Sequence, residues 1–109
     1  MEVQIEAWNE ADNGPFSEDA MRRVMAERGF AVSHYVYPPG TIFSEHTHGE
    51  DKLEGVVSGR FRMTMGGHSV VLEPGDMLAV PGGVEHRAEV VGEAEVVSLD
   101  GVRMPPGRE

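Results

Sequence analysis

The sequence predicts an all-β fold, a sandwich or barrel of short strands, with one α-helix near the N-terminus. From residue 30 onward, β-rich runs follow one another at a spacing of about 8 to 12 residues, and Gly and Pro separate them. Residues 17–29 instead carry apolar side chains at helical spacing. The chain has 109 residues, of which 39% are hydrophobic, and this suits one compact domain.

Charge and composition narrow the classes of partner. The chain carries 19 acidic residues against 9 Lys and Arg, a formal net charge of -10, so its field repels phosphate backbones and anionic lipids. We therefore expect neither nucleic acid nor a membrane as partner. Because no cysteine is present, histidine nitrogen and carboxylate oxygen remain as metal donors. The acidic N-terminus has no apolar run resembling a signal peptide, so we expect a cytoplasmic protein.

The first expected element is a short strand over residues 2–8, EVQIEAW, where apolar and polar residues alternate. Its open edge can pair with a second copy of the chain, so we expect a homodimer. The helix follows, with Ser17 as N-cap and Gly29 as the left-handed residue past its end. Residues 1–29 are thus expected to form a strand and an amphipathic helix that packs on the barrel. The apolar stripe of this helix consists of Ala20, Met21, Val24 and Met25.

The barrel is expected to span residues 30–102, with residues 103–109 as a flexible tail. Its expected strands lie in the runs FAVSHYVY, TIFSEHTH, LEGVVSG, RFRMTMGG, HSVVLEPG, DMLAVPGG, HRAEVV and EAEVVSLDGV. Gly66 and Gly67 place a hairpin turn between the fourth and fifth. In the fourth run, alternation predicts Phe61, Met63 and Met65 in the core, and Arg60 and Arg62 at the surface.

One motif, residues 40–59, contains two histidines at a spacing that suits a metal site. On a strand, His46 and His48 face the same side with Cβ atoms about 6 to 7 Å apart, so both imidazoles can reach one ion. A second motif, residues 75–86, contains a strand that Pro and Gly end sharply, and His86 then opens the next strand. Neutral imidazoles suit first-row transition ions. The remaining His34 and His68 have no comparable context, and we expect neither to be a ligand.

Together the motifs resemble those of the cupin superfamily, G-x5-H-x-H-x3 or x4-E-x6-G and G-x5-P-x-G-x2-H-x3-N. The resemblance covers about residues 30 to 100 and implies a jelly-roll antiparallel β-barrel. It also implies that three histidines and an acid hold one divalent metal, with Fe, Mn, Zn and Ni as candidates. Two positions depart from the pattern: Lys52 stands in place of the acid and Val90 in place of the asparagine. The matching residues are Gly40, His46, His48, Gly59, Gly75, Pro81, Gly83 and His86.

Lys52 requires a compensating acid if it points inward. An ammonium about 5 Å from a divalent ion is repelled by roughly 6 to 7 kcal/mol at an effective dielectric near 20. Glu54 shares the strand face of Lys52, while Glu50 and Asp51 precede the strand and are weaker candidates. Three arrangements stay open: Glu54 is a fourth metal ligand, Glu54 is the counter-ion of Lys52, or neither residue faces the site. An inward pair of Lys52 and Glu54 is the candidate catalytic pair, for an anionic substrate group or a proton.

The expected function is that of a small cupin that binds a divalent metal through His46, His48 and His86 and acts on or binds a small molecule. As an enzyme it would be a metal-dependent oxygenase, isomerase or lyase. The alternative is a non-catalytic ligand-binding or sensor cupin, with or without metal, because the fold does not choose among these. Tyr35 and Tyr37 share one strand face and either line a pocket or cap the core.

Overall fold

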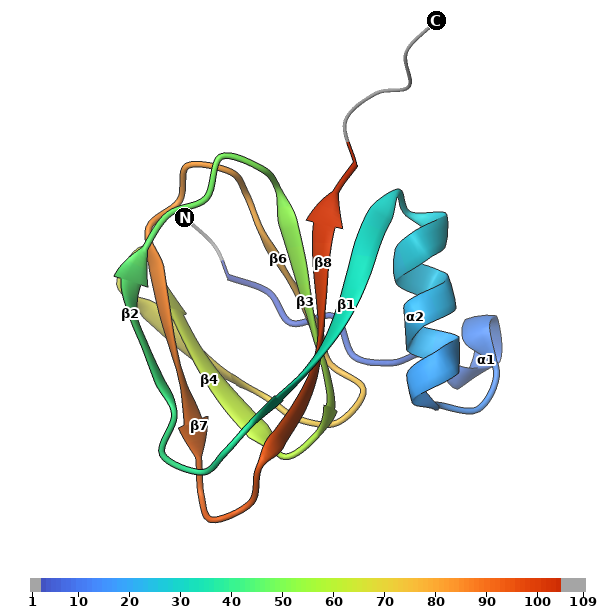
Figure 1. The fold of residues 1–109 in the computed structure, drawn as a ribbon. Coiled ribbons are helices and arrows are strands. Elements are labelled where there is room, and N and C mark those ends of the chain that lie inside the picture. Colours follow the sequence, from blue (N-terminus) through green and yellow to red (C-terminus); the bar gives the residue numbers. More distant parts are fainter. Residues whose placement is uncertain (1–2, 105–109) are drawn as a thin grey trace, which may run out of the picture.

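The computed structural model describes residues 3–104 and shows two antiparallel four-stranded sheets that face each other, with two helices beside them (Figure 1). The strand order is β1-β8-β3-β6 in one sheet and β2-β7-β4-β5 in the other. This arrangement confirms the all-β jelly-roll fold. The elements are α1 (Glu10–Asn13), α2 (Glu18–Glu27), β1 (Phe30–Tyr37), β2 (Ile42–His46), β3 (Lys52–Ser58), β4 (Arg60–Met65), β5 (His68–Leu72), β6 (Met77–Val80), β7 (His86–Val91) and β8 (Val96–Arg103).

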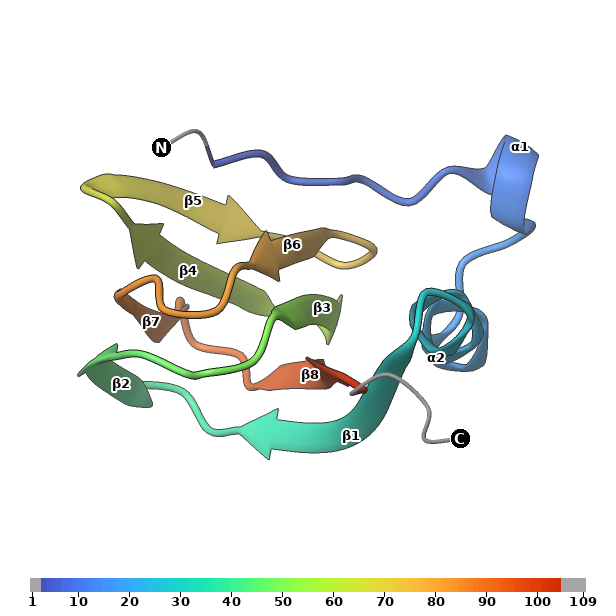
Figure 2. The ribbon, with the colours of Figure 1, turned by 90° about the horizontal axis from the view of Figure 1, so that it is seen from above.

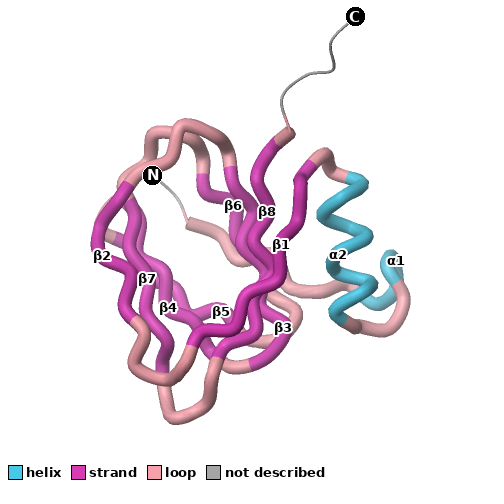
Figure 3. The backbone as a smooth tube through the Cα atoms, viewed as in Figure 1, coloured by secondary structure: helices cyan, strands magenta, loops and turns pink. Residues whose placement is uncertain are grey.

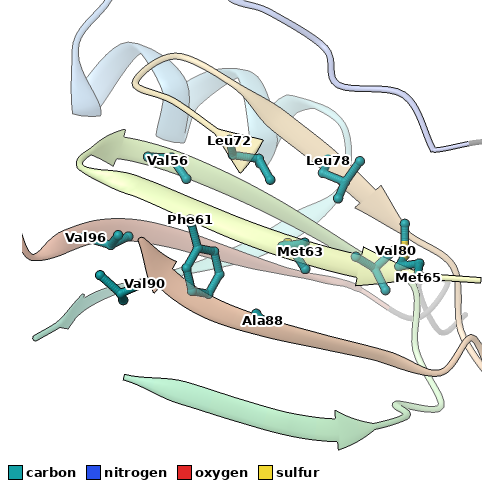
Figure 4. Packing of buried hydrophobic residues seen from close by; sticks show 10 residues of the cluster. All are labelled: Val56, Phe61, Met63, Met65, Leu72, Leu78, Val80, Ala88, Val90 and Val96. Atoms are coloured by element: carbon teal, nitrogen blue, oxygen red, sulfur yellow. The ribbon is translucent and has the colours of Figure 1, made fainter. Parts of the chain in front are cut away.

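The main core lies between the inner faces of the two sheets. Phe61, Met63 and Met65 of β4 are at most 3% exposed, so the inward face predicted from their alternation is confirmed. Arg62 lies on the opposite face of β4, where its guanidinium is 2.7 Å from Glu89 Oε1 and both side chains are 42% exposed. Figure 4 shows the buried residues of this core: Val56, Phe61, Met63, Met65, Leu72, Leu78, Val80, Ala88, Val90 and Val96.

α2 lies against the outer face of the sheet that contains β1 and β3 (Figure 2). A second apolar cluster lies between them. The Ser17 hydroxyl accepts a hydrogen bond from the Ala20 amide at 3.0 Å, which confirms the predicted N-cap. Met21 and Met25 are fully buried on β3, where a Cβ on Gly55 would lie 2.7 Å from the Met21 sulfur. The helix therefore packs closely against the strand that carries the candidate catalytic residues. Among the described residues, no helix has the length and apolar composition to cross a membrane.

The predicted N-terminal strand is wrong for residues 3–8, which contain one isolated bridge. Glu6 pairs with Met77 at the edge of β6 through two backbone hydrogen bonds of 2.9 Å, and the neighbouring residues do not extend the ladder. The chain turns instead into α1, a single helical turn whose N-cap is Asn9. Four residues are too few to give a helical period in the sequence. Residue 2 lies outside the described part, and the homodimer stays a prediction.

The C-terminal boundary also differs from the prediction. β8 includes Arg103, and the Met104 amide donates a hydrogen bond of 2.9 Å to the Gly29 carbonyl. The first two residues of the predicted tail are therefore bonded to the rest of the fold. The other five, residues 105–109, lie outside the described part of the chain.

Candidate metal centre

Three histidine rings meet at one end of the barrel. His46 ends β2, His86 begins β7 directly opposite it, and His48 lies in the loop after β2. The ring centroids are 4.3 Å apart for His46 and His86, 4.7 Å for His46 and His48, and 5.1 Å for His48 and His86. One donor nitrogen of each lies within 4.8 Å of the other two, so this group can hold a metal ion.

His48 reaches the group by a different route from the one predicted. β2 ends at His46 after a register shift that follows Phe43, so strand alternation does not place His48. The loop after β2 runs beside the loop between β6 and β7 (Figure 3). There the Gly83 amide donates to the His48 carbonyl at 2.8 Å. The second motif therefore positions a histidine of the first.

The same two loops touch at Gly82. Its amide donates to Asp51 Oδ1 at 2.8 Å, and a Cβ at this position would lie 2.5 Å from the Gly49 carbonyl oxygen. Only glycine allows this approach of the two backbones. Asp51 therefore holds the loop that carries His48.

Backbone carbonyl groups set the tautomer of two of the rings. Nδ1 of His46 lies 2.6 Å from the Ser44 carbonyl oxygen, and Nδ1 of His86 lies 2.9 Å from the Val84 carbonyl oxygen. Because a carbonyl oxygen only accepts, each Nδ1 carries the proton and each Nε2 keeps a lone pair for a metal. Burial lowers the pKa of His86. Burial also lowers the pKa of His48, and the positive charge of Lys52 lowers it further, so the neutral form that binds metal is favoured.

Lys52 points into the barrel, but its partner is an acid that the sequence analysis did not single out. Its Nζ lies 2.9 Å from Asp100 Oδ1 and 3.0 Å from Oδ2, and the two side chains are 17% and 15% exposed. Asp100 belongs to β8, the strand adjacent to β3. The lysine at the acid position is therefore compensated by a carboxylate from the neighbouring strand, and not by Glu54.

Glu54 lies opposite Asp100 in the β3–β8 register and is 8% exposed. Its carboxyl accepts a short hydrogen bond from the Ser98 hydroxyl, and it is not part of the three-histidine group. Burial raises the pKa of Glu54 to about 8, and the negative charge of Asp100 adds to this rise. Glu54 therefore keeps a proton near neutral pH. Its role as a fourth metal ligand stays a prediction, which this buried hydrogen bond does not favour.

A cavity of about 280 Å³ adjoins the histidines and the Lys52–Asp100 pair. One wall is aromatic, since the rings of Tyr35 and Tyr37 are stacked at 6.0 Å and Tyr37 lies 5.6 Å from Phe61. Both tyrosines line the cavity, and Tyr37 also packs on the core. The lining residues are Tyr35, Tyr37, Phe43, His46, His48, Lys52, Glu54, Phe61, Met63, Val80, His86, Ala88 and Asp100.

Two residues of the site were missed by sequence reasoning, Ser98 and Asp100. Both lie on the inner face of β8, where Ser98 is fully buried. Their position could have been predicted from the sequence, because Ser98 and Asp100 alternate with a period of two from the apolar Val96 and so share its strand face. His34 and His68 lie elsewhere: His34 is exposed with Nε2 3.7 Å from Glu18 Oε1, and His68 is exposed at the start of β5.

Comparison with known proteins agrees with this architecture. The cupin domain profile matches residues 33–102. The Streptomyces coelicolor protein SCO3923 is 30% identical over 90 residues, which cover 83% of this chain and 81% of that protein. An RmlC-like cupin from Shewanella frigidimarina aligns with a TM-score of 0.61 and 24% identity, over 68% of this chain and 65% of its own. Oxalate decarboxylase of Bacillus subtilis, which has Mn(II) centres, aligns with a TM-score of 0.61 and 24% identity, over 72% of this chain and 23% of its own.

The two solved structures support the fold, and the profile covers most of the chain, including all three histidines. The match also includes Lys52 and Asp100, so the ion pair lies within the barrel that the profile describes. The chain therefore belongs to the cupin domain family.

Proposed function

We propose that this protein binds one first-row divalent transition metal through His46, His48 and His86, and binds a small organic molecule in the adjoining cavity. The observation that carries the proposal is the convergence of three histidine donors, within 4.8 Å of one another, on a cavity of about 280 Å³. Three protein ligands leave coordination positions for a ligand or water.

The chemistry of the donors fits such an ion. Imidazole suits zinc, iron, nickel and copper, whereas oxygen-only sites suit calcium and magnesium. Nε2 of His46 and of His86 is the free nitrogen, since each Nδ1 is bonded to a backbone carbonyl. When bound, the ion would act as a Lewis acid toward an oxygen of the ligand. Fe, Mn, Zn and Ni are the candidates, and the Mn(II) centres of oxalate decarboxylase make Mn a useful test ion.

The residues of the chain suit a small, partly apolar molecule. The stacked rings of Tyr35 and Tyr37 provide an apolar face. Lys52 and Glu54 provide polar groups on another strand, and we propose these two as the catalytic candidates of the site. The ammonium of Lys52 is neutralised by Asp100, so it does not carry an uncompensated charge toward a bound cation.

Metal stoichiometry tests the proposal. The metal-free protein is titrated with Zn²⁺, Mn²⁺, Ni²⁺ and, without oxygen, Fe²⁺, and the bound metal is measured by calorimetry and elemental analysis. One ion per chain is expected, with at least about tenfold weaker binding in His46→Ala, His48→Ala and His86→Ala.

His68→Ala is the matched control, because His68 is exposed on β5 and should leave affinity unchanged. Equal affinity in all four variants would overturn the proposed metal site. A small ligand that binds equally well after chelation of all metal would favour the non-catalytic, metal-free alternative.

A further inference from the structure

We propose that Glu54 and Asp100 together hold one proton, and that Glu54 exchanges this proton with a small carbonyl compound bound in the cavity. The exchange rests on the proposed function of the three-histidine site, whereas the shared proton does not. The two acids are register partners on β3 and β8, and they are the two carboxyl groups that line the cavity. In this proton exchange Lys52 and Asp100 position the proton, and of the two catalytic candidates Glu54 is the one that meets the ligand.

The surroundings of the two carboxyl groups are unequal. Asp100 has a cation, Lys52, at 2.9 and 3.0 Å from its two oxygens. Glu54 is less exposed and has the neutral hydroxyl of Ser98 as its hydrogen-bond donor. Two adjacent buried carboxylates with one cation cannot both be ionised without a large cost. The proton therefore belongs to Glu54, and the charge belongs to Asp100.

One oxygen of Asp100 gives independent support. In the described structure, Oδ1 is buried, and the ammonium of Lys52, 2.9 Å away, is its one partner. A carboxylate oxygen can accept more than one hydrogen bond, so Oδ1 can take a second donor beside Lys52. The proton of Glu54 can be this second donor, and a hydrogen bond from Glu54 to Asp100 is among the causes that raise the pKa of Glu54.

The position of the proton suggests the chemistry. A metal ion held by the three histidines would polarise a bound carbonyl oxygen and so make the neighbouring C–H bond more acidic. The minor fraction of Glu54 that is ionised near neutral pH can then take that proton. The C–H bond breaks, an O–H bond forms on Glu54, and the electron pair shifts toward the carbonyl oxygen. Return of the proton to the same or the adjacent carbon restores Glu54. The net change is exchange or isomerisation, and it needs no oxidant or other co-reactant. A group that titrates near the working pH suits both directions of transfer.

Infrared spectroscopy of the metal-free protein tests the shared proton without any activity measurement. Near neutral pH, the wild type should show the carbonyl stretch of one protonated carboxyl group, and Glu54→Gln should lose it. The amide of this variant can still donate toward Asp100 and accept from Ser98, so folding should be kept. Glu27→Gln, at an exposed position of α2, is the matched control and should keep the band. In Asp100→Asn, the band should disappear at lower pH than in the wild type. A wild type without the band would overturn the shared proton.

Hydrogen exchange tests the use of the proton. Zinc-loaded protein is incubated in D₂O with pyruvate or dihydroxyacetone, and NMR follows the loss of the C–H signal beside the carbonyl. The wild type and Glu27→Gln should catalyse exchange, and Glu54→Gln should be at least about a hundredfold slower with unchanged zinc content. Exchange at the wild-type rate in Glu54→Gln, or no exchange of either compound by the zinc-loaded wild type, would overturn the acid–base role alone. Failure to bind zinc would overturn the proposed function and the exchange reaction, while the infrared band would still decide whether the proton is shared.

Discussion

Lys52 and Asp100 form an ion pair inside the barrel, with Nζ 2.9 Å from Oδ1. The two residues come from adjacent strands and are separated by 48 positions in the chain. The pair explains how a lysine can occupy the acid position of the cupin motif beside a candidate metal site: the carboxylate of Asp100 offsets part of its charge.

The first prediction concerns this pair. Lys52→Met should lower the free energy of unfolding by about 3 kcal/mol, because Asp100 is left as a mostly buried carboxylate without a cation. Urea denaturation of the metal-free protein measures the loss. Arg62→Met is the control, since its pair with Glu89 is 42% exposed on both sides and should contribute less than about 1 kcal/mol. If both variants lose the same free energy of unfolding, the Lys52–Asp100 pair does not have the larger contribution to stability that its burial predicts.

The second prediction concerns the pH dependence of metal binding. Metal binds the neutral imidazole, so affinity falls where the histidines become protonated. The pKa values of His48 and His86 are lowered from the usual 6.5, and we therefore expect affinity to hold down to about pH 6.5 and to fall only below it. Zinc titrations across this range measure the midpoint. A loss of affinity that begins well above this pH would show that the rings are not held in the neutral form.

The third prediction concerns Glu54 and stability. The pKa of Glu54 is raised from 4.5 to about 8, so between these values the folded protein binds more protons than the unfolded chain. The free energy of unfolding should then fall as pH rises through this window, by at most about 1.4 kcal/mol per pH unit. The stability that the protonated carboxyl of Glu54 contributes is fully present below pH 4.5. In Glu54→Gln this pH dependence should be absent. If the free energies of unfolding of the wild type and Glu54→Gln differ by the same amount at every pH, the raised pKa is refuted.

The fourth prediction concerns the turn between β3 and β4. Gly59 has φ 82°, and a Cβ there would collide with the Glu95 carbonyl oxygen and lie 3.0 Å from the Val96 Cα. Gly59→Ala should therefore lower the free energy of unfolding by more than about 2 kcal/mol. Gly67 has φ 79° but open space around it, so Gly67→Ala should lose only about 1 kcal/mol. Thermal unfolding of both variants compares the two, and similar losses would show that the collision is relieved by a small backbone shift.

Local patterns predicted much of the fold. Alternation identified the buried face of β4, and the N-cap Ser17 and the left-handed Gly29 located both ends of α2. The predicted strand over residues 3–8 failed because alternation shows that a segment can be half buried, but not that an edge is available along its length. Only Glu6 meets β6.

The histidines of the site were predicted from two separate sequence motifs and their resemblance to cupin motifs. These identified the three members of the group, although β2 ends before His48. The counter-ion of Lys52 could not be predicted, because Asp100 becomes its neighbour only through the pairing of β3 with β8. Without that register, Glu54 was the nearest acid on the same face.

The two backbone carbonyls that hold His46 and His86 have a consequence for how the protein can change. Each ring is oriented by an oxygen two residues earlier in its own segment. Side chains on the opposite sheet, such as those of Tyr35 and Ser98, can therefore be replaced while the donor nitrogens keep their directions. Binding of the ion and choice of the organic ligand are separable traits, so the barrel can acquire a new specificity by mutation without rebuilding its coordination site.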